Sequence, residues 1–299
     1  MSHYTLLKKE NKELQTFYQK YCITPPPHAD WAAQYQGTRI TAYQSGKILF
    51  QGKNAEQEYY RWQKEEKEEK EEKESSSSSL SQLSLIGSDE VGNGSYFGPL
   101  VVVAAYVTKE DIPWLTTLGV ADSKTLTDEK MKKIAPQLKE KLPYQALIVS
   151  PKKYNAIQPR YNAVKMKVAL HNQALLLLEK RIEKENQPLD ALLIDQFTSE
   201  KNYQQYVKEE KEQPHHPVLM RVKGEQEHLA VAAASIIART LFLEQLEQLG
   251  APYHLTLPSG AGEKVDQVGV ELCRRYGVDI LEKIAKLHFK NTQKIKAKL

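Results

Sequence analysis

The 299-residue sequence has little of several features that would assign a protein to a class. Its two cysteines, Cys22 and Cys273, lie far apart without CxxC spacing, which argues against a disulfide framework or a cysteine zinc site. Its longest apolar run, residues 99–107, is too short for a membrane helix, and no secretory apolar stretch stands at the N-terminus. A net charge of only +4 indicates no class of partner. We therefore expect a cytoplasmic protein without a membrane partner.

A low-complexity segment divides the sequence. Residues 64–74 read KEEKEEKEEKE and residues 75–79 are all serine, a composition typical of a solvated spacer. We expect a small domain over residues 1–63, a linker over 64–79 and a larger domain over 80–299, with both domains in the usual size range. The three segments carry net charges of +3, −3 and +4, so the acidic linker conceals two mildly basic domains.

The small domain is predicted to contain both helix and sheet. Its predicted elements are a helix over residues 11–21 and a hairpin of strands 38–43 and 47–51. Strand alternation places Arg39, Thr41 and Tyr43 on one face and Ile40 and Ala42 on the other. The first face would suit a nucleic acid, since it is basic and aromatic. The pattern equally allows Tyr43 merely to cover a sheet edge.

The larger domain alternates strand-like and helix-like stretches, which predicts an α/β layer fold. Predicted strands cover residues 85–86, 100–107, 146–149 and 191–194, and predicted helices cover residues 128–142, 162–185 and 228–249. The first half of the last helix, residues 229–238, is apolar nearly all round and is therefore expected to be buried.

The densest candidate site is the segment IGSDEVGNGSYFGP, residues 86–99. Its adjacent carboxylates, Asp89 and Glu90, stand between an apolar strand and a glycine-rich loop. In a regular strand the two side chains would point to opposite faces, so one shared metal centre requires the strand to end or bulge there. The carboxylates would raise each other's pKa unless a divalent cation neutralised them. The alternative is a polar turn with one capping Asp.

Other candidates have ordinary explanations when each is taken alone. Asp195 ends an apolar run, at the kind of strand end where α/β sheets assemble sites. Glu225 precedes the apolar helix, where the macrodipole favours a carboxylate. The Asp-Ser-Lys of residues 122–124 is typical of a turn or helix start. The pair His215-His216 lacks zinc-helix spacing and is expected to be solvated.

Five blocks of the sequence, in this order, resemble bacterial ribonuclease HIII of the type 2 ribonuclease H family. They are GSDEVGNGSYFGP (87–99), DSK (122–124), LIDQF (193–197), EQEHLAVAAASIIAR (225–239) and AKLHFKNT (285–292). The resemblance implies a ribonuclease H-like catalytic domain, with a mixed sheet flanked by helices. The small domain, with SGKILFQG at 45–52, is similar to the family's α+β substrate-binding domain, which is folded like half of a TATA-box-binding protein.

The resemblance implies an endonuclease that cuts the RNA strand of an RNA/DNA hybrid, leaving 5′-phosphate and 3′-hydroxyl ends. The family's acidic quartet falls on Asp89, Glu90, Asp195 and Glu225, with the first three as direct ligands of Mg²⁺ or Mn²⁺. Hard oxygen ligands suit these ions, and a pair of ions would orient the attacking water and stabilise the departing 3′ oxygen. For Glu225 a role in positioning water or another ligand stays open.

The resemblance also implies nucleic-acid contacts. Gly92-Asn93-Gly94 matches the family's glycine loop, where backbone amides approach ribose 2′-hydroxyls, although Asn93 replaces a threonine. Ser123 and Lys124 are expected to contact phosphates. The rival functions are ribonuclease HII-like incision at single ribonucleotides in duplex DNA and non-catalytic hybrid binding. The small domain argues against the first and the complete acidic quartet against the second. We expect a monomer.

Overall fold

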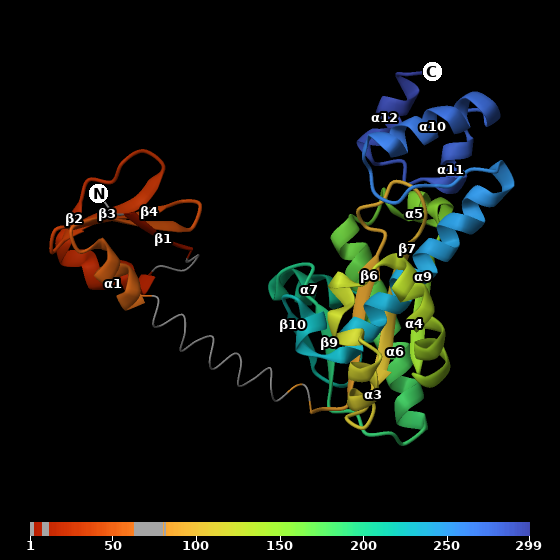
Figure 1. Cartoon of the computed structure of the whole chain (residues 1–299), viewed down its shortest axis with the longest axis horizontal. Helices are drawn as coiled ribbons and strands as arrows, with labels where there is room; N and C mark the ends of the chain where they lie inside the picture. The colour runs from red at the N-terminus through yellow and green to blue at the C-terminus, as the bar shows by residue number, and fades with distance from the viewer. Residues whose placement is uncertain (1–2, 8–11, 63–79, 81) are drawn as a thin grey trace. The chain divides into compact units, whose positions relative to one another are not determined.

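The computed structural model describes residues 3–7, 12–62, 80 and 82–299. These residues belong to two compact units, which divide between Ser77 and Ser78 (Figure 1). The predicted linker, residues 64–79, lies outside the described residues and stays a prediction.

The N-terminal unit is an antiparallel sheet with helices on one face. The sheet has five strands in the order β1-β5-β4-β3-β2. The strands are β1 (His3–Leu7), β2 (Cys22–Ile23), β3 (Ala29–Tyr35), β4 (Thr38–Tyr43) and β5 (Lys47–Gly52). The helices are α1 (Lys12–Tyr18), the 3₁₀ helix η1 (Gln19–Tyr21) and a helix that includes residues 55–62. The predicted hairpin is therefore confirmed as β4 and β5.

Strand β4 separates a buried face from an open one. Ile40 and Ala42 are fully buried in a core with α1 and residues of the helix at 55–62. On the other face, Arg39 is exposed and Tyr43 half-buried, whereas Thr41 is buried between neighbouring strands. Because β4 is the central strand of the sheet, Tyr43 does not lie on an edge strand. The predicted alternation is confirmed, and it leaves Arg39 exposed on the face opposite the core.

The C-terminal unit is built on a mixed five-stranded sheet in the order β10-β9-β6-β7-β8. β6 runs antiparallel to β7 and parallel to β9, while β10 continues the parallel part and β8 the antiparallel part. The strands are β6 (Leu85–Val91), β7 (Leu100–Val107), β8 (Tyr144–Val149), β9 (Ala191–Asp195) and β10 (Val218–Arg221). Residues of β7 are buried along the whole strand because helices cover both faces.

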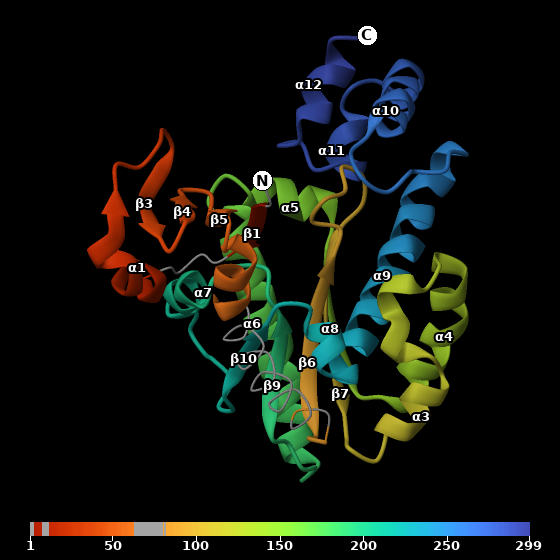
Figure 2. The ribbon, with the colours of Figure 1, turned by 60° about the vertical axis from the view of Figure 1, so that its left-hand side comes forward.

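The helices form two layers, one on each side of the sheet (Figure 2). The first layer holds α9 (Leu229–Gly250), α4 (Asp128–Lys141), α3 (Ile112–Thr117) and η2 (Val120–Thr125); the second holds α6 (Ala163–Lys184) and α7 (Glu200–Val207). The remaining helices are α5 (Pro151–Ile157), α8 (Gly224–Glu227), η3 (Ala251–Tyr253), α10 (Glu263–Tyr276), α11 (Ile280–Ile284) and α12 (Lys290–Lys296).

Helix α9 packs closely on β6 and β7 because the contact is made by small residues. A Cβ placed on Gly87 would lie 2.3 Å from the backbone nitrogen of Val231, so only glycine lets the helix approach. The helix is long and apolar enough to cross a membrane, but 61% of its most apolar window is buried inside the unit. It is therefore the core helix that the sequence predicts.

The predicted helix starts are confirmed by their capping contacts. The Thr127 side chain accepts a hydrogen bond from the backbone N–H of Lys130 at the start of α4, and Asn162 does the same for Lys165 at the start of α6. Strand β6 is longer than predicted, since it continues through both candidate carboxylates.

Candidate active site

Asp89 and Glu90 lie in the second half of β6, which pairs with β7 along its whole length up to Val91. The expectation that the strand ends or bulges at these carboxylates is wrong, and so is the alternative of a capped turn. Because successive side chains of a regular strand point to opposite faces, the two carboxylates separate. Asp89 meets Ser235 of α9, whereas Glu90 meets Lys167 of α6. The motif supplies one carboxylate to each face of the sheet.

Asp89 and Asp195 come together where the parallel pairing of β6 and β9 ends. β6 and β9 are parallel, and their last paired residues are Ser88 and Ile194, so the two aspartates follow in register. Burial, together with the charges of Glu90 and Asp195, raises the pKa of Asp89 to about 7, although a hydrogen bond from Ser235 opposes the rise. The predicted repulsion is confirmed for Asp89.

Glu90 has the opposite electrostatic environment. Its Oε1 accepts a hydrogen bond from Lys167 Nζ at 2.8 Å, and its Oε2 from His171 Nε2 at 3.0 Å. Burial alone would raise the pKa of Glu90, but the hydrogen bond and charge of His171, with those of Lys167, outweigh burial and lower it. The predicted rise in the pKa is therefore wrong for Glu90, which stays ionised.

Glu225 is brought to the end of β9 by a short helix rather than by a loop. The backbone N–H of Gly224, the first residue of α8, donates to Asp195 Oδ1 at 2.8 Å. A Cβ on Gly224 would lie 3.2 Å from Asp195 Cα, so the glycine permits this approach. Glu225 follows and is only 5% exposed. The fold therefore carries Glu225 to the strand end where Asp195 lies.

The segment with Ser123 and Lys124 adjoins Glu225. Both residues belong to η2, which packs against α8 and α9. A cavity of about 330 Å³ has Ala121 of η2 and Glu225 in its wall. The side chains of residues 122–124 lie outside the described part of the structure, so their predicted phosphate contacts stay predictions.

The glycine loop begins where β6 ends. Gly92 has φ 99°, and a Cβ there would lie 2.2 Å from the carbonyl oxygen of Pro99, so both the backbone conformation and the space require glycine. The backbone N–H of Ser95 closes the turn by donating to the carbonyl of Gly92 at 3.1 Å. Asn93 and Gly94 are exposed at the surface, where a ligand has access to their backbone.

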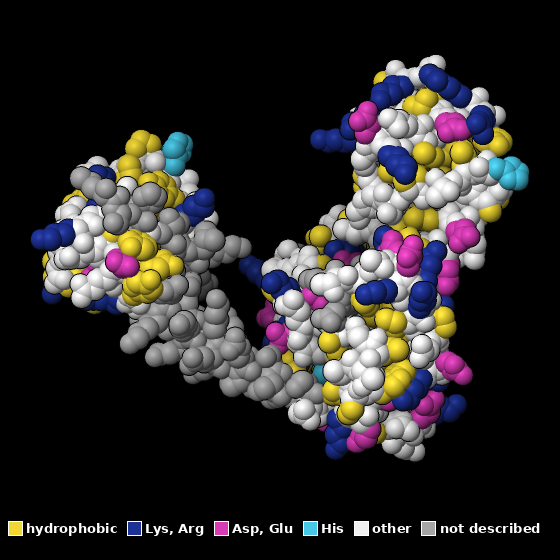
Figure 3. Space-filling model, viewed as in Figure 1, with side chains coloured by type: hydrophobic (Ala, Val, Ile, Leu, Met, Phe, Trp, Pro, Cys, Tyr) yellow, Lys and Arg dark blue, Asp and Glu magenta, His cyan; other side chains and the backbone are white. Residues whose placement is uncertain are grey.

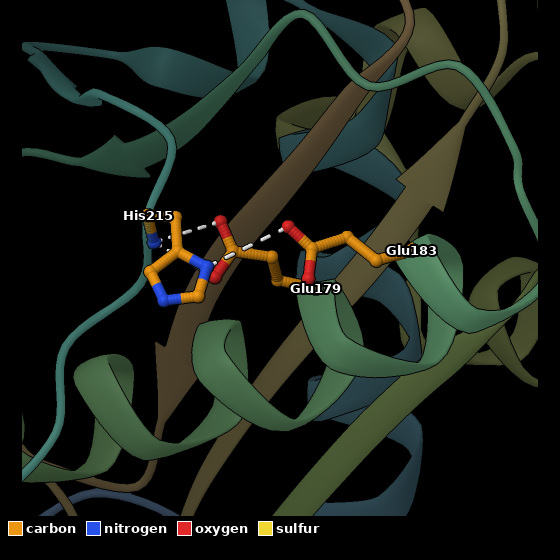
Figure 4. Close-up of side chains that lie close together, drawn as sticks. All are labelled: Glu179, Glu183 and His215. Atoms are coloured by element: carbon orange, nitrogen blue, oxygen red, sulfur yellow. Dashed lines mark hydrogen bonds and ion pairs between the residues drawn. The ribbon is translucent and has the colours of Figure 1, made fainter.

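A second group of possible ligands consists of Glu179 and Glu183, farther along α6, and His215 of the loop before β10 (Figure 4). Among the described residues, this is the group in which one ligand atom of each residue lies within 4.8 Å of the others; the predicted quartet is not gathered so tightly. Glu179 is fully buried and accepts hydrogen bonds from the backbone N–H groups of His215 and His216. These bonds account for the burial of Glu179 as an anchor for the loop before β10.

The two loop histidines differ in their surroundings. His215 is exposed, as predicted. His216 is half-buried, because its Nδ1 lies 2.9 Å from Glu179 Oε1, so the expectation of a solvated side chain is wrong for this residue.

The sequence interpretation missed Lys167 and His171. A usable signal was present, because Val164, Val168, Leu175 and Leu178 follow helical spacing and His171 occupies a position of that same stripe. A polar residue inside an apolar stripe needs a buried partner. Lys167, four residues earlier, shares that side of the helix.

Comparison with known proteins identifies relatives of both units. A family model described as Ribonuclease HII matches residues 86–292, and a model described as Domain of unknown function (DUF3378) matches residues 4–75. The chain is 49% identical to a ribonuclease HIII of Enterococcus faecalis over 292 residues, which covers 96% of this chain and 95% of the relative. It is 48% identical to a ribonuclease HIII of Streptococcus gordonii, with coverage of 99% and 98%.

Among solved structures, the crystal structure of Bst-RNase HIII in complex with Mn²⁺ is similar to this chain. The two sequences are 38% identical, the TM-score is 0.71, and the match covers 99% of this chain and 98% of the other. The similarity extends over both units, so it includes the five-stranded antiparallel sheet as well as the mixed sheet.

Proposed function

The chain belongs to the ribonuclease HIII family, and on this premise we propose that Asp89, Glu90, Asp195 and Glu225 form its catalytic centre. Ribonuclease HIII cleaves the RNA strand of RNA/DNA hybrids in a metal-dependent reaction, and its catalytic unit has the ribonuclease H-like fold. The observation that carries the residue assignment is the meeting of Asp89 and Asp195 at the point where the parallel pairing of β6 and β9 ends.

The donor set fits a divalent cation. Asp89, Asp195 and Glu90 offer carboxylate oxygens, which Mg²⁺ and Mn²⁺ prefer. Although Glu90 leaves the other face of β6, its charge raises the pKa of Asp89, which supports placing both carboxylates around one centre. The raised pKa of Asp89 reflects burial and the neighbouring negative charges of Glu90 and Asp195, and a cation at this point would neutralise those charges. We assign these three residues as ligands of Mg²⁺ or Mn²⁺; when bound, such ions activate water and stabilise charge on a departing oxygen. The ends produced in this chemistry are 5′-phosphate and 3′-hydroxyl.

The residues of the chain prepare this centre. The Ser235 hydrogen bond favours the ionised form of Asp89, and the Gly224 N–H fixes one oxygen of Asp195. Glu225, carried on α8, is assigned to position water or a ligand at the same strand end. The exposed backbone of Gly92-Asn93-Gly94 is assigned to recognise ribose 2′-hydroxyls, and Ser123 and Lys124 to contact phosphates.

Two basic surfaces would hold the polyanionic hybrid. Arg39 projects from the face of the N-terminal sheet that is not covered by helices. On the C-terminal helices, Lys and Arg side chains outnumber acidic ones in the view of Figure 3, and the last turns of α10 and α12 contain Arg274, Arg275, Lys294 and Lys296. We assign the first surface to substrate binding by the small domain.

We also propose that the protein acts as a cytoplasmic monomer.

The substitution Asp89→Asn tests the catalytic centre. It removes one charged ligand without changing volume, so cleavage of a labelled RNA/DNA hybrid in Mg²⁺ should fall by at least about a thousandfold, about 4 kcal/mol of barrier. Binding of the hybrid, measured by fluorescence anisotropy in chelator, should change less than about threefold. Full cleavage by the purified variant would contradict the assignment. A one-ribonucleotide DNA duplex serves as the rival substrate, and its preferred cleavage would favour ribonuclease HII-like incision.

The substitution Arg39→Gln tests the small domain in the full-length chain. Loss of one phosphate contact should weaken hybrid binding about threefold and reduce the slope of log K against log salt by about one. Lys20→Gln in η1 is a matched control that removes an exposed cation from the helical side of the same unit. Equal effects of the two substitutions, or no effect of Arg39→Gln, would remove this surface from substrate binding.

A further inference from the structure

Two residues of α6, Lys167 and His171, hold both oxygens of Glu90. We infer that they are positioning residues, which hold the Glu90 carboxylate in the orientation required for the metal site before metal arrives. This inference rests on the proposed function, because it assumes that Glu90 is a metal ligand. It adds two residues, both outside the acidic motif, to the parts that determine metal affinity.

The burial of this group explains why Glu90 needs such partners. The side chain of Glu90 is 10% exposed, that of Lys167 7% and that of His171 0%. A carboxylate left without partners at this depth would carry a large desolvation cost. Two donors on separate oxygens stabilise the charged form and fix the orientation of the carboxylate plane, while each oxygen keeps further lone pairs for a ligand.

The two donors are themselves fixed from both strands of the site. A carboxylate only accepts hydrogen bonds, so His171 Nε2 is protonated and donates to Glu90. The other ring nitrogen, His171 Nδ1, lies 2.6 Å from the hydroxyl of Ser88 on β6. The ring of Phe197, two residues after Asp195, stacks on His171 with centroids 4.9 Å apart. Lys167 Nζ lies 4.2 Å from the centroid of the same ring.

Lys167 and His171 therefore connect the two strands that carry the proposed metal ligands. Both residues contact Glu90 of β6, and both contact Phe197, which follows β9. Groups that orient metal ligands in this way typically change metal affinity by 10–100-fold when removed. A bare charge effect has the opposite sign, because removal of Lys167 would make the site more negative and bind cations more tightly.

The sign of the change in Mn²⁺ affinity therefore tests the inference. Lys167→Met keeps the length of the side chain and removes its charge and its hydrogen bonds. In the full-length protein without substrate, isothermal titration calorimetry should show Mn²⁺ dissociation constants at least about tenfold higher than those of the parent chain. In hybrid cleavage, kcat at fixed Mg²⁺ should fall while KM for the hybrid stays within about twofold. Unchanged or tighter Mn²⁺ binding would overturn the positioning role.

Three companion variants separate positioning from general damage. Lys167→Arg, which keeps charge and donors, should recover most of the Mn²⁺ affinity. Lys165→Met removes a cation that pairs with Glu209 at the surface of the same helix, and it should leave Mn²⁺ binding unchanged. In a Glu90→Gln background, Lys167→Met should produce no further loss, since it acts through Glu90. A loss of the same size in that background would overturn the inference.

The same experiments distinguish this inference from the proposed function. If Glu90→Gln itself leaves Mn²⁺ binding unchanged, the assignment of Glu90 as a ligand fails. If Glu90→Gln weakens binding and Lys167→Met does not, the ligand assignment holds and only the positioning role is lost. Thermal unfolding followed by circular dichroism identifies any variant that fails to fold.

Discussion

The two faces of the catalytic sheet give adjacent carboxylates opposite properties. On the α9 face, Asp89 lies among small and apolar residues, and burial together with negative neighbours raises its pKa to about 7. On the α6 face, Glu90 lies between a lysine and a histidine, which lower its pKa despite burial. Two adjacent residues of one strand therefore supply one carboxylate with negative neighbours and one carboxylate that is hydrogen-bonded by Lys167 and His171.

The same contrast extends to the buried histidines of the two layers. His228, which begins α9, meets only backbone groups: its Nδ1 accepts from the N–H of Ala230, and its Nε2 donates to the carbonyl of Leu83. In the α6 layer, His171 and His216 lie against carboxylates. We conclude that the α9 layer keeps its buried histidine neutral, whereas the α6 layer places its histidines against carboxylates.

The largest stability effect expected from this contrast comes from His228. Burial lowers the pKa of His228 to about 4, although the hydrogen bond to Leu83 opposes the change. Above about pH 7, His228 is unprotonated in both the folded and the unfolded protein. As pH falls below about 6.5, the unfolded chain takes up the proton and the folded protein does not, so the folded state loses about 2 kcal/mol by pH 5 and about 3 kcal/mol by pH 4. Because the raised pKa of Asp89 acts in the opposite direction over the same range, the loss is measured as the difference between the parent chain and a His228 variant in urea unfolding of the metal-free protein at about pH 7.5 and pH 5.

His228→Asn isolates the contribution of that side chain, since asparagine also caps helix starts. The variant should lose about 2 kcal/mol less than the parent chain between the two pH values. His254→Asn is the matched control, because His254 is exposed and has φ 53°, a conformation that asparagine tolerates. Equal pH dependence of the parent chain and His228→Asn would show that the two layers do not differ in this way.

Sequence patterns predicted the long helices of the two layers, but not the short helices α3 and α7 or strand β10. The helix over residues 162–185 followed from its apolar stripe and from Asn162, and α9 followed from a run that is apolar on all sides. Asp89, Glu90, Asp195 and Glu225 were found because the motif blocks resemble a known family. Asp89 and Asp195 are brought together by the parallel pairing of β6 with β9. Pairing between strands that are distant in sequence cannot be read from a local pattern.

The direction of each side chain was harder to predict than its presence. Glycines after Glu90 suggested that the strand would break at the carboxylates, but pairing with β7 keeps β6 regular to Val91. Lys167 was overlooked because a lysine in a helix is usually solvated. His216 was misjudged because its partner, Glu179, is distant in sequence and itself buried.

A smaller effect is expected at Glu179, which tests whether all buried charge in the α6 layer serves the active site. Glu179→Gln replaces one carboxylate oxygen by an amide donor that faces the N–H groups of His215 and His216. Loss of a charge-assisted acceptor should lower the free energy of unfolding by about 2 kcal/mol. Because the loop lies away from Asp89 and Asp195, kcat for hybrid cleavage and the Mn²⁺ dissociation constant should stay within about twofold.

Glu183→Gln is the matched control for this substitution. Glu183 lies one helical turn farther along α6, its side chain is 40% exposed, and its contacts with the loop histidines are at least 3.7 Å long. Its replacement should therefore change the free energy of unfolding by less than about 0.5 kcal/mol. A tenfold loss of Mn²⁺ affinity in Glu179→Gln would mean that the loop anchor and the Glu90 group are coupled through α6. The α6 layer would then act as one electrostatic unit rather than as separate supports for a ligand and a loop.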